Sequence, residues 1–200
     1  MAFGAIRADW RRAYLLTSGG RARRVAACLS MPGFQAVAVY RFGRWLLEQP
    51  LAVRVPLEPL YRVAYLLVQV LWGIELPRRA RIGPGLVIAH FGGIVVSERA
   101  VIGASCNLSQ QITIGVGGKG AKGGAPVIGD DVFIAPGARV FGRIRVGNNV
   151  AIGANAIVHK DIPDNAVVVL DPGFQIVSYK GNRCRAAPAA AARASARSAS

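Results

Sequence analysis

The chain has 200 residues, a length that suits one continuous hydrophobic core with a small appended subdomain. Hydrophobic residues make up 52% of it, which excludes a chain that is disordered throughout. The formal net charge of +15 suggests anionic partners, but the basic residues are spread along the chain and match no nucleic-acid-binding motif, so we expect no nucleic-acid partner.

Residues 1–73 are predicted to form a helical cap. Apolar residues at helical spacing predict helices over residues 3–16, 18–29, 34–47 and 60–72, with Pro50, Pro56 and Pro59 in the connection before the last one. The last helix is apolar nearly all round, so we expect it to be buried against the other helices or another subunit. Peripheral contact of the cap with a membrane is the second interpretation.

Aliphatic residues then recur every sixth position between Ile74 and Ile162. A period of six is neither helical nor the alternation of a half-buried strand. It is typical of a parallel β-helix, in which each hexapeptide supplies a short strand and a corner and three hexapeptides make one triangular coil. The fold class predicted is therefore mainly β, with an N-terminal α-helical cap.

The repeat predicts three columns of inward-facing residues. They are Leu76, Ile94, Ile114, Val140 and Val158; Ile82, Ile102, Ile128 and Val146; and Ile88, Leu108, Ile134 and Ile152. Two extra residues between Ile94 and Ile102 predict a small corner bulge. Eight extra residues between Ile114 and Ile128 predict a protruding loop over residues 116–126, because its many glycines cannot pack a core.

The loop and the C-terminal region differ in composition from the repeats. Lys119 and Lys122 in the loop could meet a phosphate group of a ligand; the alternative is that they serve solubility. We expect the β-helix domain to cover residues 74–181. Residues 182–200 are rich in Ala, Arg and Ser without apolar periodicity, which predicts a disordered tail.

The cysteines and the N-terminus bear on the compartment. Cys28, Cys106 and Cys184 have neither metal-ligand spacing nor a paired framework, and Cys106 falls at an inward position where a free thiol packs as a small hydrophobe. Met1–Trp10 has charges but no apolar core, so we expect no secretory signal. Together these features predict a cytoplasmic protein without a metal.

Polar residues at the corners are the candidate site. His90 stands at a corner, and the spacing predicts that it stacks with Gln110, Pro136 and Ala154 in the coils above. Glu75, expected opposite Gly93, could orient the imidazole, so that the other nitrogen takes a proton from a hydroxyl. The alternative is a histidine that only makes structural hydrogen bonds.

Two further residues follow from this corner. The glycines around His90 clear space for a ligand, so Gly92 and Gln110 are candidate substrate contacts. His159, beside Lys160, is predicted to lie on the surface.

The motifs resemble those of the serine acetyltransferase family of hexapeptide acyltransferases. The segments concerned are Gly73-Ile74-Glu75, Ile82-Gly83-Pro84-Gly85, His90 to Val96, Ser109 to Gly115, the Gly/Lys loop to Pro126, and Asp171 to Val177. The resemblance implies a left-handed β-helix, a homotrimer or a multiple of it, acetyl-CoA as donor, and active sites between subunits. It also implies direct transfer, with His90 catalytic, Glu75 in place of the family's aspartate, and the pantetheine arm near Val116, Pro136 and Ala154.

Two departures from the family concern the acceptor. Ala89 stands where the family has an aspartate before the histidine, and Gly124-Ala125 stand where it has Arg-His before the proline. A serine substrate would lose the charged partners of its ammonium and carboxylate. The chain therefore resembles the branch that acetylates sugar hydroxyls in polysaccharide assembly. Serine O-acetylation in cysteine biosynthesis and a non-catalytic β-helix scaffold are the alternatives.

Overall fold

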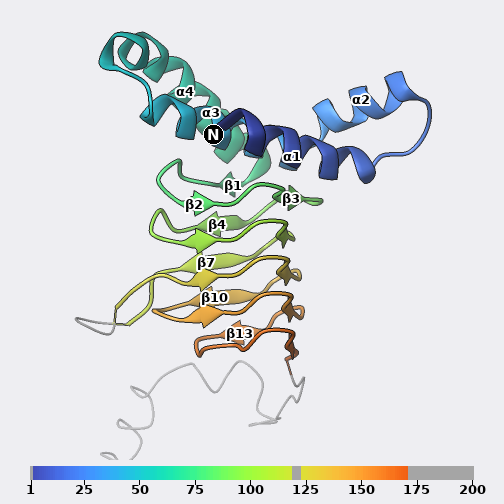
Figure 1. Cartoon of the computed structure of the whole chain (residues 1–200), viewed down its shortest axis with the longest axis vertical. Helices are drawn as coiled ribbons and strands as arrows, with labels where there is room; N and C mark the ends of the chain where they lie inside the picture. Colours follow the sequence, from blue (N-terminus) through green and yellow to red (C-terminus); the bar gives the residue numbers. More distant parts are fainter. Residues whose placement is uncertain (1, 119–122, 171–200) are drawn as a thin grey trace, which may run out of the picture. The chain divides into compact units, whose positions relative to one another are not determined.

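The computed structural model describes residues 2–118 and 123–170, and shows a helical cap followed by a stack of short strands (Figure 1). The helices are α1 (Ala2–Leu15), α2 (Arg21–Ser30), α3 (Pro32–Leu47) and α4 (Leu51–Trp72). All four precede the first strand, as the apolar spacing predicts. The expectations for Lys119, Lys122, the part of the β-helix domain after residue 170 and residues 182–200 lie outside the described residues.

The described chain after α4 contains fourteen strands of two or three residues, joined by turns. They are β1 (Ile74–Glu75), β2 (Arg81–Ile82), β3 (Val87–Ile88), β4 (Ile94–Val96), β5 (Val101–Ile102), β6 (Asn107–Leu108), β7 (Thr113–Gly115), β8 (Val127–Ile128), β9 (Phe133–Ile134), β10 (Arg139–Phe141), β11 (Arg145–Val146), β12 (Ala151–Ile152), β13 (Ile157–Val158) and β14 (Val167–Val168). Three sheets run β1-β4-β7-β10-β13, β2-β5-β8-β11 and β3-β6-β9-β12-β14, with every strand pairing parallel. This is a three-faced parallel β-helix.

The register confirms two of the three predicted columns. Ile82 lies opposite Ile102, and the column continues through Ile128 to Val146. The column that begins at Ile88 continues through Leu108, Ile134 and Ile152 as predicted. These inward residues are buried in one continuous core, since each small coil can remove its apolar face from water only by stacking on its neighbours.

The first column was assigned one wrong residue. Val96, not Ile94, lies opposite Ile114, and Ile94 lies opposite Ile74. The two extra residues therefore precede Ile94 and do not follow it. Five residues separate Ile88 from Ile94, whereas three separate Leu108 from Ile112 in the next coil. The sequence alone allowed both placements because Ile94 and Val96 are both inward-facing and buried.

Corner residues adopt the left-handed conformation that a tight change of direction requires. At one corner Ser105, Asp131, Asn149 and Asn165 have φ between 53° and 62°. Asn and Asp tolerate this region better than other residues because their short polar side chains bond locally. Asp130 and Asn148 add to the corner, since each accepts a backbone N–H from the preceding coil (Ala104 N at 2.6 Å and Asp130 N at 2.8 Å).

Helix α4 differs from its prediction in two respects. It begins at Leu51 and runs through Pro56 and Pro59, which were expected in a connection. Each proline lacks the N–H that would bond to the fourth residue before it, but those residues, Ala52 and Val55, are exposed to solvent. The helix is also not buried all round, because within it only Tyr61 and Val68 are buried.

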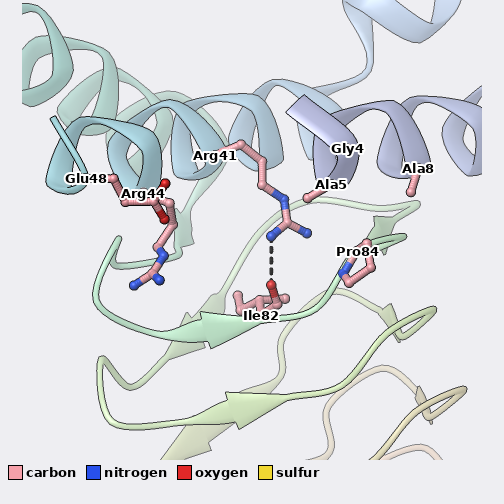
Figure 2. Close-up of a pocket in the computed structure, with 8 residues that line it drawn as sticks. All are labelled: Gly4, Ala5, Ala8, Arg41, Arg44, Glu48, Ile82 and Pro84. Carbon is pink, nitrogen blue, oxygen red and sulfur yellow. Dashed lines mark hydrogen bonds between the residues drawn. The ribbon is translucent and has the colours of Figure 1, made fainter. Parts of the chain in front are cut away.

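A buried ion pair fixes the cap to the first coil. Asp9 of α1 is 0% exposed and accepts from Arg41 Nε at 2.7 Å and from the backbone N–H groups of Gly85 and Leu86 at 2.7 and 2.8 Å. Arg41 of α3 also donates to the carbonyl oxygens of Ile82 and Gly83 at 2.7 and 2.6 Å. Figure 2 shows the Arg41–Ile82 bond. No pattern in the sequence pointed to Asp9.

Removing the charge of Asp9 is expected to destabilise the protein strongly. In Asp9→Asn the buried guanidinium of Arg41 loses its counter-ion, and breaking one side of a buried pair costs about 3–5 kcal/mol. Urea unfolding followed by circular dichroism measures this change in the free energy of unfolding. The matched control is Glu98→Gln, which breaks the exposed Arg79–Glu98 pair at 3.8 Å and should stay within about 1 kcal/mol. Equal effects of the two substitutions would contradict the structural role of Asp9.

A second link joins α4 to the first coil and is sensitive to pH. Arg78 donates to both carboxylate oxygens of Glu58 at 2.9 and 2.8 Å. The hydrogen bonds from Arg78, followed by that from Arg62, lower the pKa of Glu58 to about 2 from an ordinary 4.5. Because the folded pKa lies below the unfolded value, the link stabilises the fold fully above pH 4.5 and loses its effect as pH falls toward 2.

The comparison of wild type with Glu58→Gln tests this pH dependence. The wild-type chain should be the more stable at pH 7, and the difference in the free energy of unfolding should shrink between pH 5 and pH 3 as Glu58 begins to bind a proton in the unfolded chain. Urea titrations at fixed pH values measure it. A difference that stays constant across this range would show that the Glu58 carboxylate does not act through its charge.

Candidate active site

His90 lies in the one corner of its column that carries two additional residues. The carbonyl of Gly92 accepts the N–H of Gln111, that of Gln110 accepts Gly137 N–H, and that of Pro136 accepts Asn155 N–H. This ladder makes Gly92 the equivalent of Gln110 and Pro136. The predicted stacking of His90 with them is therefore wrong, because His90 and Phe91 are the inserted pair that bulges out of the coil.

The bulge is open on one side and supported on the other. His90 is exposed, and Gly92 and Gly93 take φ of 102° and 67°, values that favour glycine. A Cβ on Gly92 would meet no atom within 4 Å, so the space beside the histidine is free. Phe91 packs edge-on against Trp72, the last residue of α4, with ring centroids 5.4 Å apart. The cap thus helps to hold the corner that presents His90.

Glu75 lies on β1, the strand that pairs with the β4 into which this corner leads. Its partner in β4 is Val95, two residues beyond the Gly93 expected from the spacing, because the insertion shifts the register. Its side chain is exposed. Within the part of the chain that the structure describes, no hydrogen bond or ion pair joins Glu75 to His90, so its role as partner stays a prediction.

The remaining predicted site residues occupy two edges of the same face. Gly92, Gln110, Pro136 and Ala154 form the corner column before β4, β7, β10 and β13. Val116, which is 49% exposed, follows β7 at the opposite end of that face. The structure therefore separates Val116 from Pro136 and Ala154 within one chain. Lys119 lies outside the described residues.

Gln110 carries an unsatisfied acceptor. Its Oε1 is buried and has no hydrogen-bond partner among the described residues. Buried polar atoms are nearly always paired, so such an atom is a candidate to accept a hydrogen bond from a bound molecule or a neighbouring chain. The role of Gln110 as a substrate contact stays a prediction.

The protruding loop begins and ends as a hairpin. Gly117 and Gly124 exchange two backbone hydrogen bonds of 3.0 Å across its base. A Cβ on Gly117 would approach the ring of Phe141 to 2.9 Å, so the loop leaves the coil in close contact with β10. His159 stacks on the same ring with centroids 6.3 Å apart and is exposed, as its predicted surface position requires.

The described cysteines are unsuited to hold an acyl group. Burial raises the pKa of the Cys106 thiol to about 11 and also raises that of Cys28. Both thiols therefore stay protonated near neutral pH, and the thiolate is the nucleophilic form. Cys106 is 1% exposed, which confirms its predicted inward position.

A pocket of about 520 Å³ lies between the cap and the first coil, away from His90. Figure 2 shows its lining, which includes Arg41, Arg44 and Glu48 of α3 with Ile82 and Pro84 below. The guanidinium of Arg41 is already occupied by Asp9 and two carbonyl oxygens. We therefore assign this pocket to the packing of the cap. Among the described residues, no group of three or more His, Cys, Asp or Glu side chains could hold a metal ion.

Comparison with known proteins gives one consistent name. The chain is 35% identical over 171 residues to a serine acetyltransferase of Synechococcus elongatus, covering 86% of this chain and 67% of that protein. It is 37% identical over 144 residues to a serine acetyltransferase of Mycobacterium tuberculosis, covering 71% and 59%. No protein-family model matches the chain.

Solved structures give the same picture. Serine acetyltransferase of Neisseria gonorrhoeae in complex with serine superimposes with a TM-score of 0.70 at 28% identity, over 87% of this chain and 68% of that one. Serine acetyltransferase 1 of Entamoeba histolytica in complex with L-cysteine gives 0.67 at 29% identity, over 84% and 63%. The chain thus spans about two thirds or less of the length of these proteins.

Proposed function

The chain belongs to the serine acetyltransferase family, and from this premise we propose that it is an acetyl-CoA-dependent O-acetyltransferase with His90 as general base. One observation carries the choice of residue: His90 is exposed on a corner enlarged by two residues, beside glycines that leave room for an acceptor. In this proposal residues 1–73 are the cap and residues 74–181 the acyltransferase domain, a left-handed β-helix as in the family.

The proposed reaction is a direct transfer. The acceptor hydroxyl oxygen attacks the thioester carbonyl carbon of acetyl-CoA while an imidazole nitrogen of His90 takes the hydroxyl proton. The carbon–sulfur bond then breaks, the acetyl ester is left on the acceptor, and the CoA thiolate receives the proton from the imidazolium. Glu75 is proposed to orient the ring and to stabilise its charged form. The buried, protonated states of Cys28 and Cys106 support a path without an acyl-cysteine.

L-Serine is the acceptor that the comparisons favour. The relatives described above are all named serine acetyltransferase, and none supports the sugar acceptor and polysaccharide synthesis expected from the sequence. A sugar hydroxyl stays as the second candidate on one specific observation: Ala89 and Ala125 offer no charge to a serine ammonium or carboxylate, where the family has charged side chains.

We further propose a homotrimer, or a multiple of it, with the site between subunits. Val116 and the Pro136–Ala154 column lie at opposite ends of one face, so a single chain does not gather the residues proposed to bind the donor. If the Val116 edge of one subunit faces the Pro136–Ala154 edge of its neighbour, the two sets of residues come together. Exposed apolar side chains along the β-helix, among them Phe133, Phe141 and Ile157, would be covered by such a contact.

The variant His90→Ala is expected to lose acetyl transfer by about 100-fold to 10,000-fold, the usual contribution of a general base. Glu75→Gln should lose less, since Glu75 orients the base and does not itself take the proton. Release of CoA from acetyl-CoA in the presence of acceptor measures both. Binding of CoA, followed by calorimetry, should be unchanged in both variants.

The matched control for His90→Ala is His159→Ala, because His159 is the other histidine of the chain and is exposed. It should keep the wild-type rate. Near-normal turnover by His90→Ala would exclude His90 as the base, and equal losses in both variants would indicate damage to the fold.

An acceptor panel separates the two candidate substrates. With wild-type enzyme and acetyl-CoA, L-serine is expected to give saturable CoA release, whereas nucleotide sugars and oligosaccharides should give only background. The reverse result would assign the enzyme to sugar hydroxyls. In that case Ala89→Asp, which restores the family's carboxylate beside His90, should raise the rate with serine and lower the rate with the sugar.

A further inference from the structure

An unpartnered apolar surface covers the side of α4 that faces away from α3. The helix has 22 residues and is about 33 Å long at 1.5 Å per residue. All of its exposed apolar residues except Leu51 form what we term the apolar arc, namely Ala52, Val53, Val55, Pro56, Pro59, Leu60, Val63, Leu66, Leu67, Val70 and Leu71. At 100° per residue they span about 160° of the helix surface, and no charged side chain falls among them.

The apolar arc is too large to be left facing water. Val70 is 73% exposed, Val55 64% and Leu60 58%, and exposed apolar side chains continue along the whole helix. Contiguous apolar surface of this extent on a folded chain marks a contact with a protein or a membrane. No helix in the described part of the chain is long and apolar enough to cross a bilayer, so a membrane contact would have to be peripheral.

A basic pocket of about 630 Å³ borders the arc. Arginines 54, 62, 78 and 79 line it together with Val55 and Pro59 of the arc, and Glu58 is its only carboxylate. Glu58 is shared by three of these arginines, with N–O distances of 3.9, 3.2 and 2.8 Å. Arg79 pairs with the exposed Glu98 at 3.8 Å and with no other carboxylate of the described residues. Even with both carboxylates counted, two positive charges are in excess beside the arc.

Charge decides between the possible occupants. Residues 1–73 contain ten arginines and no lysine against three carboxylates, a net charge of +7. A second copy of the cap would bring like charges together, whereas an anionic bilayer offers acyl chains to the arc and phosphate groups to the arginines. An amphipathic helix with a basic edge and a broad apolar face is typical of a helix that lies in the membrane interface.

We propose that α4 docks the protein on anionic phospholipid membranes. The apolar arc enters the boundary between headgroups and acyl chains, and the arginines of the basic pocket bind headgroup phosphates. Arg62 and Arg79, with side chains 76% and 73% exposed, are the two best placed to reach them. The proposal is independent of the reaction and would hold for either acceptor.

Vesicle flotation with the full chain tests the proposal. The chain should float with vesicles of phosphatidylcholine containing phosphatidylglycerol and stay in solution with phosphatidylcholine alone. The double variant Val63→Gln, Val70→Gln should bind the anionic vesicles at least about tenfold more weakly, because two apolar contacts become polar. Arg62→Gln and Arg79→Gln should each weaken binding about fivefold and reduce its salt dependence.

Matched controls lie on the β-helix, outside α4. Val167→Gln replaces a valine that is 74% exposed, and Arg99→Gln replaces an exposed corner arginine. Both should leave vesicle binding unchanged, and circular dichroism should show the same helix content in all variants.

Three results would overturn the proposal. Absence of binding to anionic vesicles is the first, and equal losses in the α4 variants and the β-helix controls is the second. The third is a sedimentation experiment in which the double variant Val63→Gln, Val70→Gln splits the wild-type assembly into smaller ones. A second copy of the chain would then cover the arc.

Discussion

Stacking of one coil on the next is the constraint on which the structure depends. A coil with three strands of two or three residues has no core of its own and buries its inward side chains only between the coils above and below. An inward residue is therefore required at every strand, and any addition must go to a corner. Two additions are present, the pair His90–Phe91 and the loop that begins at Gly117 and returns at Gly124. The same rule that makes the strands regular leaves the corners free to carry chemistry.

The first coil has no coil on its N-terminal side, and the cap takes that place. Tyr40 donates to the carbonyl of Ala80 at 2.8 Å and accepts the N–H of Ile82 at 3.1 Å, so it continues the backbone bonding of the coil. Asp9 and Arg41 satisfy further N–H and carbonyl groups at the next corner. The cap thus ends the β-helix on one side, where an open edge would invite pairing with another chain. It also positions the His90 corner through Trp72 and Phe91.

Membership of the family does not by itself identify the acceptor. Shared fold and repeats place this chain among the serine acetyltransferases, and the proposed base and donor rest on that membership. Recognition of serine depends on a few charged side chains, and two positions that carry them in the family are alanine here. Fold similarity therefore favours serine as the acceptor, whereas the residues at the site do not favour it. Function depends on the residues of the site and not on the fold.

The repeat determined the parallel β-helix, two of its three columns and the inward Cys106, because a period of six allows one packing of aliphatic residues in three stacked faces. For the candidate site, the sequence predicted the corner position of His90 and its glycines, but the stacking of His90 with Gln110, Pro136 and Ala154 was wrong. Ile94 and Val96 are both apolar and inward, so only the pairing of Ile94 with Ile74 decided where the two extra residues lie. Likewise α4 reads as apolar on every side, and only its packing against α3 decided which side stays exposed. The Asp9–Arg41 pair joins residues 32 positions apart, a contact that no local pattern encodes and that tertiary packing alone brings together.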